Sequence, residues 1–390
     1  MKIMLIAYNN EKKWQDLSCL TKSEIAVLKK EQWYCPTCQS RVMIKNGLHQ
    51  MSHFSHWSKD ACQAFSDNES QNHLLGKTSI MSNALRFGYE AQLEAYLPDL
   101  NQRPDVLIPP NLAIEVQCSS LNEARLKERT SQYKAHGFQD IWLLGPALHL
   151  KHKMRTLHKQ VAQTTINLGC HLYEYHIDTS EIHLLYGITE HDSRLYFKRK
   201  IWSLRESSLL EIVTAKVKKQ TMVYQSPVLV DYEERSILTC QKKLRHQQKE
   251  MMAVQSFLYE HQLNVLSLPS LLLYPTMYHP TLGCREIILR YYVWTYFSEH
   301  GTGTMKDMLL YIKEQLALDS CHLGDYGDTQ DCMTYGVIVY LSCLLEHHRL
   351  TSRLSNKGET VFFLVKPSID QTKIEREILW LPLKYDMIIK

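Results

Sequence analysis

The chain has 390 residues, of which 44% are hydrophobic and 22% are charged, and its formal net charge is +4. This length and composition exclude a disordered chain and suffice for two or three domains with cores of their own. The charge is too small to indicate nucleic-acid binding by itself. The eleven cysteines, an odd number with one Cys-x-x-Cys pair, are typical of a reducing compartment in which some thiols bind metal.

No apolar segment of the sequence predicts a membrane protein. The N-terminal segment, residues 1–7, has too short an apolar run for a signal sequence and lacks a cleavage site of small residues. The longest apolar stretch, residues 336–345, is also too short to cross a bilayer. We therefore expect a soluble, cytoplasmic protein that does not associate with membranes.

The first predicted unit, residues 1–62, is a small module. It has a strand over 2–8 and a helix over 22–30 that begins at Thr21 or Ser23, followed by cysteines and histidines. Residues 63–190 have the alternating pattern of an α/β domain. Its expected helices cover 68–87, 120–136 and 147–163, and its expected strands cover 91–97, 102–108, 112–117, 141–144, 171–177 and 182–188.

Residues 191–390 are expected to be mainly helical. Basic residues cluster at 198–200, 216–219 and 242–249. Helices expected over 285–299, 303–316 and 332–348 precede two alternating runs that flank Asn356-Lys357-Gly358, a hairpin turn signal. Three helices followed by a hairpin are the pattern of a winged helix.

Two carboxylates occupy polar positions of short β-type runs in the second unit. Asp105 lies in Arg-Pro-Asp-Val-Leu-Ile, and Glu115 lies in Leu-Ala-Ile-Glu-Val-Gln, with Asn111 marking the turn between the two runs. An antiparallel pair would bring these acids side by side, where they repel unless a cation lies between them. Oxygen ligands suit Mg²⁺ or Mn²⁺, and such a site is equipped for phosphodiester hydrolysis.

This constellation resembles the PD-(D/E)XK nuclease motif, with Gln117 in place of the usual lysine. With Glu69-Ser70, His73, Lys77, Arg129, Tyr133 and Trp142-Leu-Leu-Gly145, and with Cys35-Pro-Thr-Cys38 and His53-Phe-Ser-His56 upstream, residues 1–146 resemble the competence protein CoiA family. The resemblance implies a restriction-endonuclease-like mixed sheet flanked by helices. It also implies a role in natural transformation, when incoming single-stranded DNA is recombined into the chromosome.

The catalytic roles follow from the expected geometry. Asp105 and Glu115 should bind one metal ion, and the carbonyl of Val116 and the carboxylate of Glu69 can add ligands, the latter directly or through water. Gln117 is neutral and orients only water or a phosphate oxygen, so Lys77 is the candidate for the missing positive charge. Because Glu69, His73 and Lys77 share one helix face, that face points either at the metal and the phosphate or at solvent.

Four further residues are candidate DNA contacts. Arg129 and Tyr133 are four residues apart on the helix after the glutamate strand, and an arginine suits bidentate phosphate contact. The alternative is a surface arginine that covers a tyrosine. Arg103 either touches phosphate or pairs with an acid, and His73 faces the same region.

The N-terminal module contains five metal-type ligands. Cys35 and Cys38 are the firm pair of a structural Zn²⁺ site, completed either by His56 and Cys62 or by His53 and His56. The alternative is that the histidines are packed in a core and that the Cys-x-x-Cys pair is coincidental.

Two functions compete on this reading. The first is a metal-dependent nuclease that acts on single-stranded or branched DNA, with recombination proteins as possible partners. The second is a catalytically weak or inactive factor that binds or bridges DNA, in which Gln117 marks the lost chemistry. A protein without any DNA contact is disfavoured by the basic clusters.

Overall fold

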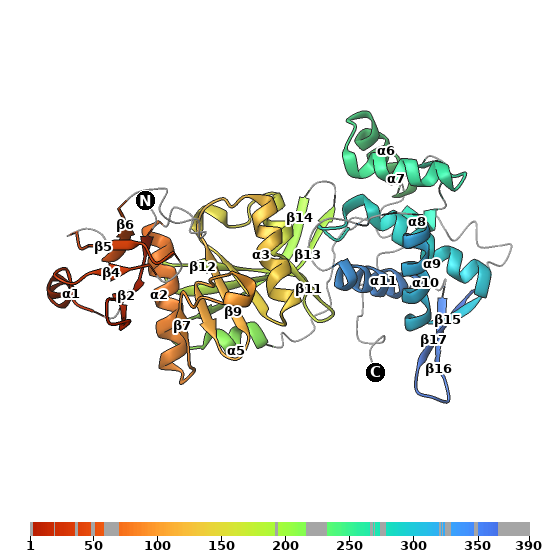
Figure 1. Ribbon diagram of the computed structural model, residues 1–390. Helices are drawn as coiled ribbons and strands as arrows, with labels where there is room; N and C mark the ends of the chain where they lie inside the picture. Colours follow the sequence, from red (N-terminus) through yellow and green to blue (C-terminus); the bar gives the residue numbers. More distant parts are fainter. Residues whose placement is uncertain are drawn as a thin grey trace.

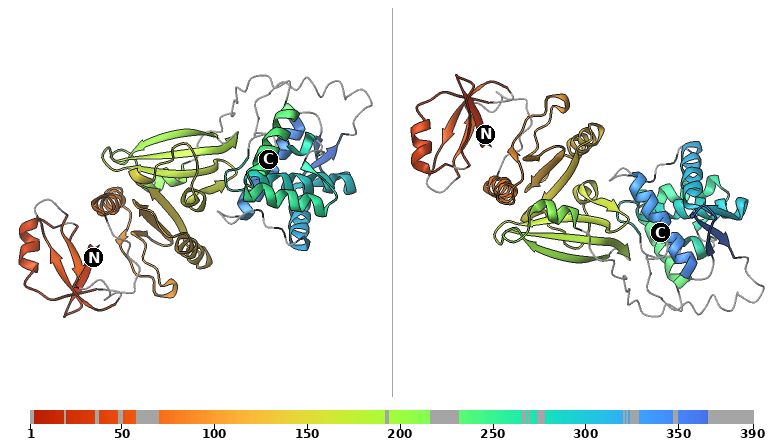
Figure 2. Two further views of the ribbon diagram at one scale, coloured as in Figure 1. Left: turned by 90° about the horizontal axis from the view of Figure 1, so that it is seen from above. Right: turned by 90° about the horizontal axis from the view of Figure 1, so that it is seen from below.

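The computed structural model describes residues 3–18, 20–35, 38–47, 51–57, 70–191, 194–215, 232–265, 268, 270–273, 278–319, 321, 323, 329–346 and 350–365. Its parts follow one another along an elongated molecule, with a small β-rich unit at one end, a large central sheet and a helical unit at the other end (Figure 1). Both views of Figure 2 show the same succession. The expected class, a mixed α/β chain with a helical C-terminal region, is confirmed.

The N-terminal unit is an antiparallel sheet with the strand order β1-β6-β5-β4-β2-β3. Its one described helix, α1 (Lys22–Leu28), begins after Thr21, whose side chain forms a reciprocal capping box with Glu24. The strands are β1 (Ile3–Met4), β2 (Ile6–Asn9), β3 (Trp14–Asp16), β4 (Trp33–Tyr34), β5 (Arg41–Lys45) and β6 (His53–His56).

The central sheet has the order β14-β13-β12-β10-β9-β8-β7, and β11 pairs with β12. β10 is parallel to β9 and to β12, and the other described pairs are antiparallel. The strands are β7 (Gln92–Leu93), β8 (Val106–Ile108), β9 (Leu112–Gln117), β10 (Gln139–Leu144), β11 (Gln163–Thr165), β12 (Gly169–His176), β13 (Glu181–His191) and β14 (Arg194–Ser203).

Helices cover both faces of this sheet. α2 (Gln71–Arg86) contacts β7, β8 and β9 and also α5 (Leu209–Thr214), whereas α3 (Glu123–Ala135) contacts β10 and α4 (Thr156–Val161). α2 lies close to the sheet at Gly76, where a Cβ atom would lie 2.7 Å from Cγ1 of Val116. This close approach holds the first half of α2 over the ends of β8 and β9.

The C-terminal unit has the arrangement that its sequence pattern predicts. α9 (Glu286–His300), β15 (Thr302–Thr304), α10 (Met305–Leu318), α11 (Thr329–Glu346), β16 (Leu350–Leu354) and β17 (Thr360–Leu364) follow in order. The strands form a sheet in the order β15-β17-β16. Three helices with this small sheet form a winged-helix arrangement. It is preceded by α6 (Tyr232–Arg245), α7 (Lys249–Glu260) and α8 (Ser270–Leu273).

Two expectations for the middle of the chain are wrong. The helix expected over 147–163 is limited to α4, because residues 146–148 form a 3-10 turn and the chain then runs irregularly to Thr156. The sheet also does not end near residue 190. β14, expected within a mostly helical region, pairs with β13, and α5 then packs on α2. No residue along β14 is fully buried, and this exposure suits an edge strand with one open face.

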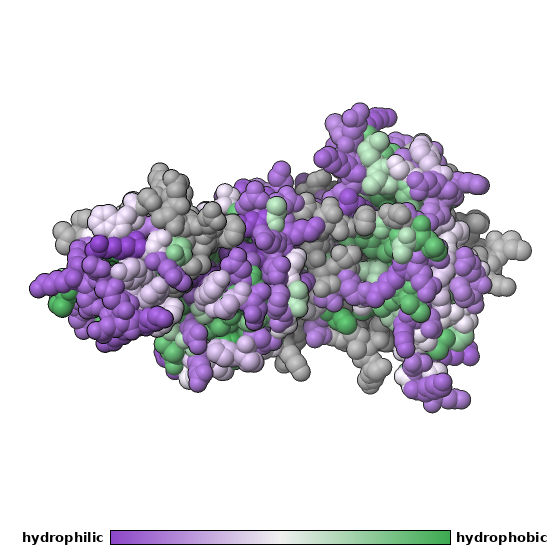
Figure 3. All heavy atoms as spheres, viewed as in Figure 1, coloured by the Kyte–Doolittle hydropathy of each residue, from purple (hydrophilic) through white to green (hydrophobic). Residues whose placement is uncertain are grey.

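The two outer units both contact the central one. Leu5, between β1 and β2, is fully buried in the core cluster formed by α2 and the central sheet. At the other end, α11 contacts β11, and Cys332 Sγ lies 3.3 Å from Thr164 Oγ1. On the face shown in Figure 3, apolar residues gather mainly over the C-terminal helices. No helix in the described part of the chain has the length and apolar character needed to span a membrane.

Candidate active site and metal centre

Asp105 and Glu115 meet where the β8–β9 ladder ends. The pairs Ile108–Leu112, Leu107–Ala113 and Val106–Ile114 place Asp105 opposite Glu115, one step beyond the last pair. The turn between the strands contains Pro109, Pro110 and Asn111, as predicted. The hairpin therefore brings the two carboxylates to the same end of two neighbouring strands.

The side chain of Asp105 replaces a missing backbone partner. Its Oδ2 accepts a hydrogen bond of 2.8 Å from the N–H of Val116 and lies 2.9 Å from Nε2 of His73 on α2. Burial alone would raise the pKa of Asp105, but the charge and hydrogen bond of His73 hold it well below its usual range. Asp105 is therefore a carboxylate anion at every pH near neutral.

Glu115 is buried from the opposite side by α3. Its Oε1 accepts a 2.6 Å hydrogen bond from the hydroxyl of Tyr133 and forms an ion pair with Nη2 of Arg129. Burial raises the pKa of Glu115 to about 7, Arg129 opposes this, and the charge of Asp105 adds to it. The two carboxylates thus have opposite pKa shifts, and a cation between them would favour ionised Glu115.

Arg129 and Tyr133 lie inside the protein. Tyr133 has no exposed surface, and the Arg129 side chain is 12% exposed and lies over the Trp142 ring. Contact between Tyr133 and DNA does not fit this geometry, and neither does the alternative of a surface arginine. Instead both residues hold one oxygen of Glu115 in place.

Lys77 is fully buried, and its ammonium group lies 2.5 Å from Oε1 of Glu94. Glu94 also accepts a hydrogen bond from the backbone N–H of Leu5 and lies 3.8 Å from Nη1 of Arg103. The alternative reading of Arg103, pairing with an acid, is therefore the one observed. Since His73 and Lys77 both point inward, their helix face is not the solvated ladder that was the other possibility.

Glu94 is the residue of this network that sequence reasoning missed. Its backbone N–H donates to the carbonyl of Asp105 at 3.0 Å, and its φ is +49°. Glu94 follows β7, which the sequence predicts as a longer strand. A glutamate within an otherwise strand-like run, nine residues before Arg103, was the available signal.

Gln117 is the last residue of β9, and the nitrogen of its side-chain amide is hydrogen-bonded within the chain. Its Nε2 donates to the carbonyl of Ser119 at 2.7 Å, and its backbone carbonyl accepts from Gly145 at 2.8 Å. A Cβ atom at Gly145 would lie 2.7 Å from Sγ of Cys118. The amide is thus oriented by its own chain, and Gln117 supplies no positive charge to the site.

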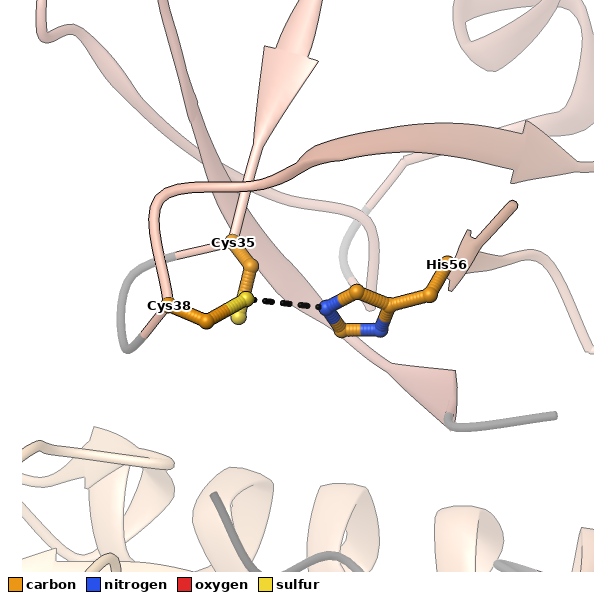
Figure 4. Close-up of side chains that lie close together, drawn as sticks. All are labelled: Cys35, Cys38 and His56. Carbon is orange, nitrogen blue, oxygen red and sulfur yellow. Dashed lines mark hydrogen bonds between the residues drawn. The ribbon is translucent and has the colours of Figure 1, made fainter. Parts of the chain in front are cut away.

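The N-terminal unit gathers three thiol and imidazole ligands. Ligand atoms of Cys35, Cys38 and His56 all lie within 4.8 Å of one another, and Cys38 Sγ is 3.3 Å from His56 Nε2. Figure 4 shows the thiols of Cys35 and Cys38, which follow β4, and the imidazole of His56, which lies on β6, converging on one point. Soft thiolates with one imidazole suit Zn²⁺.

His53 is outside this group. His53 and His56 are three residues apart on β6, so they point to opposite faces of the sheet. The imidazole of His53 instead lies 2.9 Å from the carbonyl of Met51, and burial lowers its pKa. Two candidate ligands, Glu69 for the carboxylate site and Cys62 for the thiol site, lie outside the described residues.

Comparison with known proteins follows the same division of the chain. The protein-family model described as "Competence protein CoiA, N-terminal domain" matches residues 17–65, and the family model described as "Competence protein CoiA, nuclease-like domain" matches residues 69–218. The second range includes β14 and α5, in agreement with the extended sheet. The search of solved structures found no significant match.

A curated relative supports the same assignment. Competence protein CoiA of Bacillus subtilis (strain 168) is 31% identical over 121 residues, which are 30% of this chain. The match spans 32% of the relative, about a third of its length. With both domain models matched in order, this chain belongs to the competence protein CoiA family.

Proposed function

We propose that this protein is a metal-dependent DNA nuclease that processes recombination intermediates during natural transformation. The observation that carries the proposal is the position of Asp105 and Glu115 opposite each other at the open end of the β8–β9 ladder. Mg²⁺ or Mn²⁺ held there would act as a Lewis acid on a phosphate oxygen and lower the pKa of a bound water.

A third oxygen ligand is available on the backbone. The N–H of Val116 points toward Asp105, and in a strand the N–H and C=O of one residue face the same neighbouring strand. The Val116 carbonyl therefore faces Asp105 beyond the last ladder pair, where β8 offers no partner. Together with Glu69, this completes a donor set of oxygens, which is the set that Mg²⁺ prefers.

The surrounding residues prepare the site for a phosphodiester. His73 fixes the carboxylate of Asp105, while Arg129 and Tyr133 fix that of Glu115, so both acids are pre-oriented. Hydrolysis adds water across the P–O bond: the water oxygen bonds to phosphorus, its proton leaves to solvent or a base, and the 3′ or 5′ oxygen departs protonated. Gln117 contributes by orienting the water or a phosphate oxygen.

DNA is the proposed substrate, in single-stranded or branched form, with recombination proteins as further partners. The exposed residues Arg199 and Lys200 lie on β14, the edge strand of the same sheet, and the Lys200 ammonium group lies 4.5 Å from the Trp202 ring centroid. A basic edge with an aromatic residue suits contact with a nucleic-acid backbone. We also propose a cytoplasmic location, since the nine cysteines of the described part are thiols rather than disulfides.

The second candidate, a binding or bridging factor with weak or absent cleavage, also has an observation in its favour. Gln117 carries no charge, and the buried Lys77 is engaged by Glu94. For Lys77 to reach a phosphate, this pair would have to open. The nuclease is preferred because both carboxylates and their supporting residues are in place.

For the N-terminal unit we propose a structural Zn²⁺ site formed by Cys35, Cys38, His56 and Cys62. Tetrahedral zinc needs four ligands, and Cys62 is the remaining candidate after His53 is set aside. A closed site of this kind stabilises the fold and has no open position for substrate.

The decisive experiment is cleavage of labelled single-stranded, duplex and branched DNA with Mg²⁺ or Mn²⁺. Asp105→Asn and Glu115→Gln keep the shape of each side chain but remove its charge, and Asp99→Asn is the matched control outside the site. We expect a loss of about 100-fold or more in the first two, since metal catalysis is worth several kcal/mol. Unaltered DNA binding with no cleavage by any form would favour the binding factor.

A further inference from the structure

A second group of imidazole and carboxylate ligands lies at the far end of β12. Ligand atoms of His149, Glu174 and His176 all lie within 4.8 Å of one another. Nε2 of His176 is 3.7 Å from Oε2 of Glu174, and the rings of His149 and His176 have centroids 4.2 Å apart. Ligands bound at 2.0–2.1 Å around one zinc ion are roughly 3.4 Å apart, so this spacing suits a shared ion.

The carboxylate of Glu174 is buried with little charge compensation. Glu174 is 2% exposed, and its Oε1 accepts a 2.6 Å hydrogen bond from the backbone N–H of Leu150. Within the described chain, no lysine or arginine forms an ion pair with Glu174, and the basic group beside it is the His176 imidazole, which is charged only if protonated. A buried carboxylate needs a cation or several donors, and a metal ion would supply the charge.

The imidazoles have lone pairs available for a ligand. Nε2 of His176 is buried and, among described residues, has no hydrogen-bond partner. The His183 ring stacks on His176 at 3.7 Å, and Nε2 of His183 is 3.1 Å from Glu181. Nε2 of His149 lies 3.3 Å from the carbonyl of Tyr175, and a metal-binding histidine commonly donates its other ring N–H to such an oxygen.

This group is separate from the candidate nuclease site. Gln117, Leu144 and Glu174 lie in one row across β9, β10 and β12. Two strand spacings place Glu174 about 10 Å from Gln117. The ions of two-metal catalysis are about 3.5–4 Å apart, so an ion at Glu174 would not share a phosphate with one at Asp105.

We propose that His149, Glu174 and His176 form a binding site for one divalent transition-metal ion, with zinc as the best match to two imidazoles and a carboxylate. Such a site joins the irregular segment after β10 to the end of β12. Since Leu150 donates to Glu174, the ion would fix this segment next to the edge at which β9 ends. The proposal holds whether or not the chain cleaves DNA.

Metal content distinguishes this site from the others. The full chain, stripped with chelator, dialysed and reloaded with Zn²⁺, is measured by inductively coupled plasma mass spectrometry. His149→Ala/His176→Ala should bind one equivalent less than wild type, and His136→Ala, at the exposed histidine that follows α3, should bind as much as wild type. Glu174→Gln keeps the shape of the side chain and should weaken the binding of the same zinc ion at least tenfold.

Cobalt gives a second readout that does not depend on activity. Thiolate-to-cobalt absorption arises at the Cys35–Cys38 site and should be equal in all variants. Cobalt that has no thiolate ligand should be lost only in the variants of His149, Glu174 and His176. Equal metal content in wild type and His149→Ala/His176→Ala would overturn the proposal. An equal loss in His136→Ala would overturn it too, because the binding would then be adventitious.

Discussion

Replacing Lys77 by methionine tests the buried ion pair beneath the candidate site. Methionine retains most of the volume but leaves Glu94 as a buried carboxylate. Removing one partner of a buried pair costs about 3–5 kcal/mol. Because Arg103 remains 3.8 Å from Glu94, we expect the lower end, about 3 kcal/mol, which for a domain of this size lowers the melting temperature by about 6–12 °C.

The double variant Lys77→Met/Glu94→Gln removes the uncompensated charge as well. It should recover most of the lost stability, so the two substitutions should be strongly non-additive. Thermal unfolding monitored by hydrogen exchange of β8–β9 peptides measures this within the central domain. Additive losses would refute the reasoning, because they would show that the pair is not coupled.

The pH dependence of stability tests the same ion pair. The contribution of Glu94 to wild-type stability should be unchanged by pH above about 4.3, the usual pKa of glutamate. It should fall as pH drops toward the lower folded-state pKa of Glu94, which Lys77 and Arg103 hold down against burial.

Cleavage by the stable double variant tests the catalytic role of Lys77. If this variant loses cleavage, Lys77 contributes charge to catalysis. If it retains cleavage, Lys77 only stabilises the fold.

Three further substitutions have defined outcomes. Tyr133→Phe removes a hydrogen bond that lowers the pKa of Glu115, so it should shift the acid limb of the pH–activity profile to a higher pH than in the wild type; an unshifted profile would contradict this role. Cys35→Ser should remove one zinc equivalent by elemental analysis, whereas Cys118→Ser, whose half-buried thiol has its pKa raised to about 12, should not. Gln117→Lys should raise metal-dependent cleavage about tenfold, the effect of one added charge worth about 1.4 kcal/mol; no gain would favour the binding factor.

The parts of the fold that follow local patterns could be predicted from the sequence. The strand over 112–117 and the helix over 68–87 correspond closely to β9 and α2, because apolar periodicity and Ser70, which caps α2, are local signals. The pairing of Asp105 with Glu115 was predictable for the same reason, since one short turn fixes the register of the hairpin.

Contacts between distant segments could not be predicted in this way. Glu94 reaches Leu5, Lys77 and Arg103 only after three elements have packed. Arg129 and Tyr133 were identified as a pair, but their partner depends on how α3 lies on the sheet. His53 shows the converse: two histidines three residues apart suit a helix, and their separation follows only once β6 is known to be a strand.

The winged-helix arrangement does not by itself indicate DNA reading. In helix-turn-helix proteins the second helix enters the major groove, and here that position is held by α11. Residues 329–346 contain no lysine or arginine, and most described side chains of α11 are buried. α11 packs on α9, β16 and β11 of the central sheet. It is therefore occupied by contacts within the chain, and DNA contact is better sought along the basic edge strand β14, on the sheet that carries both carboxylates.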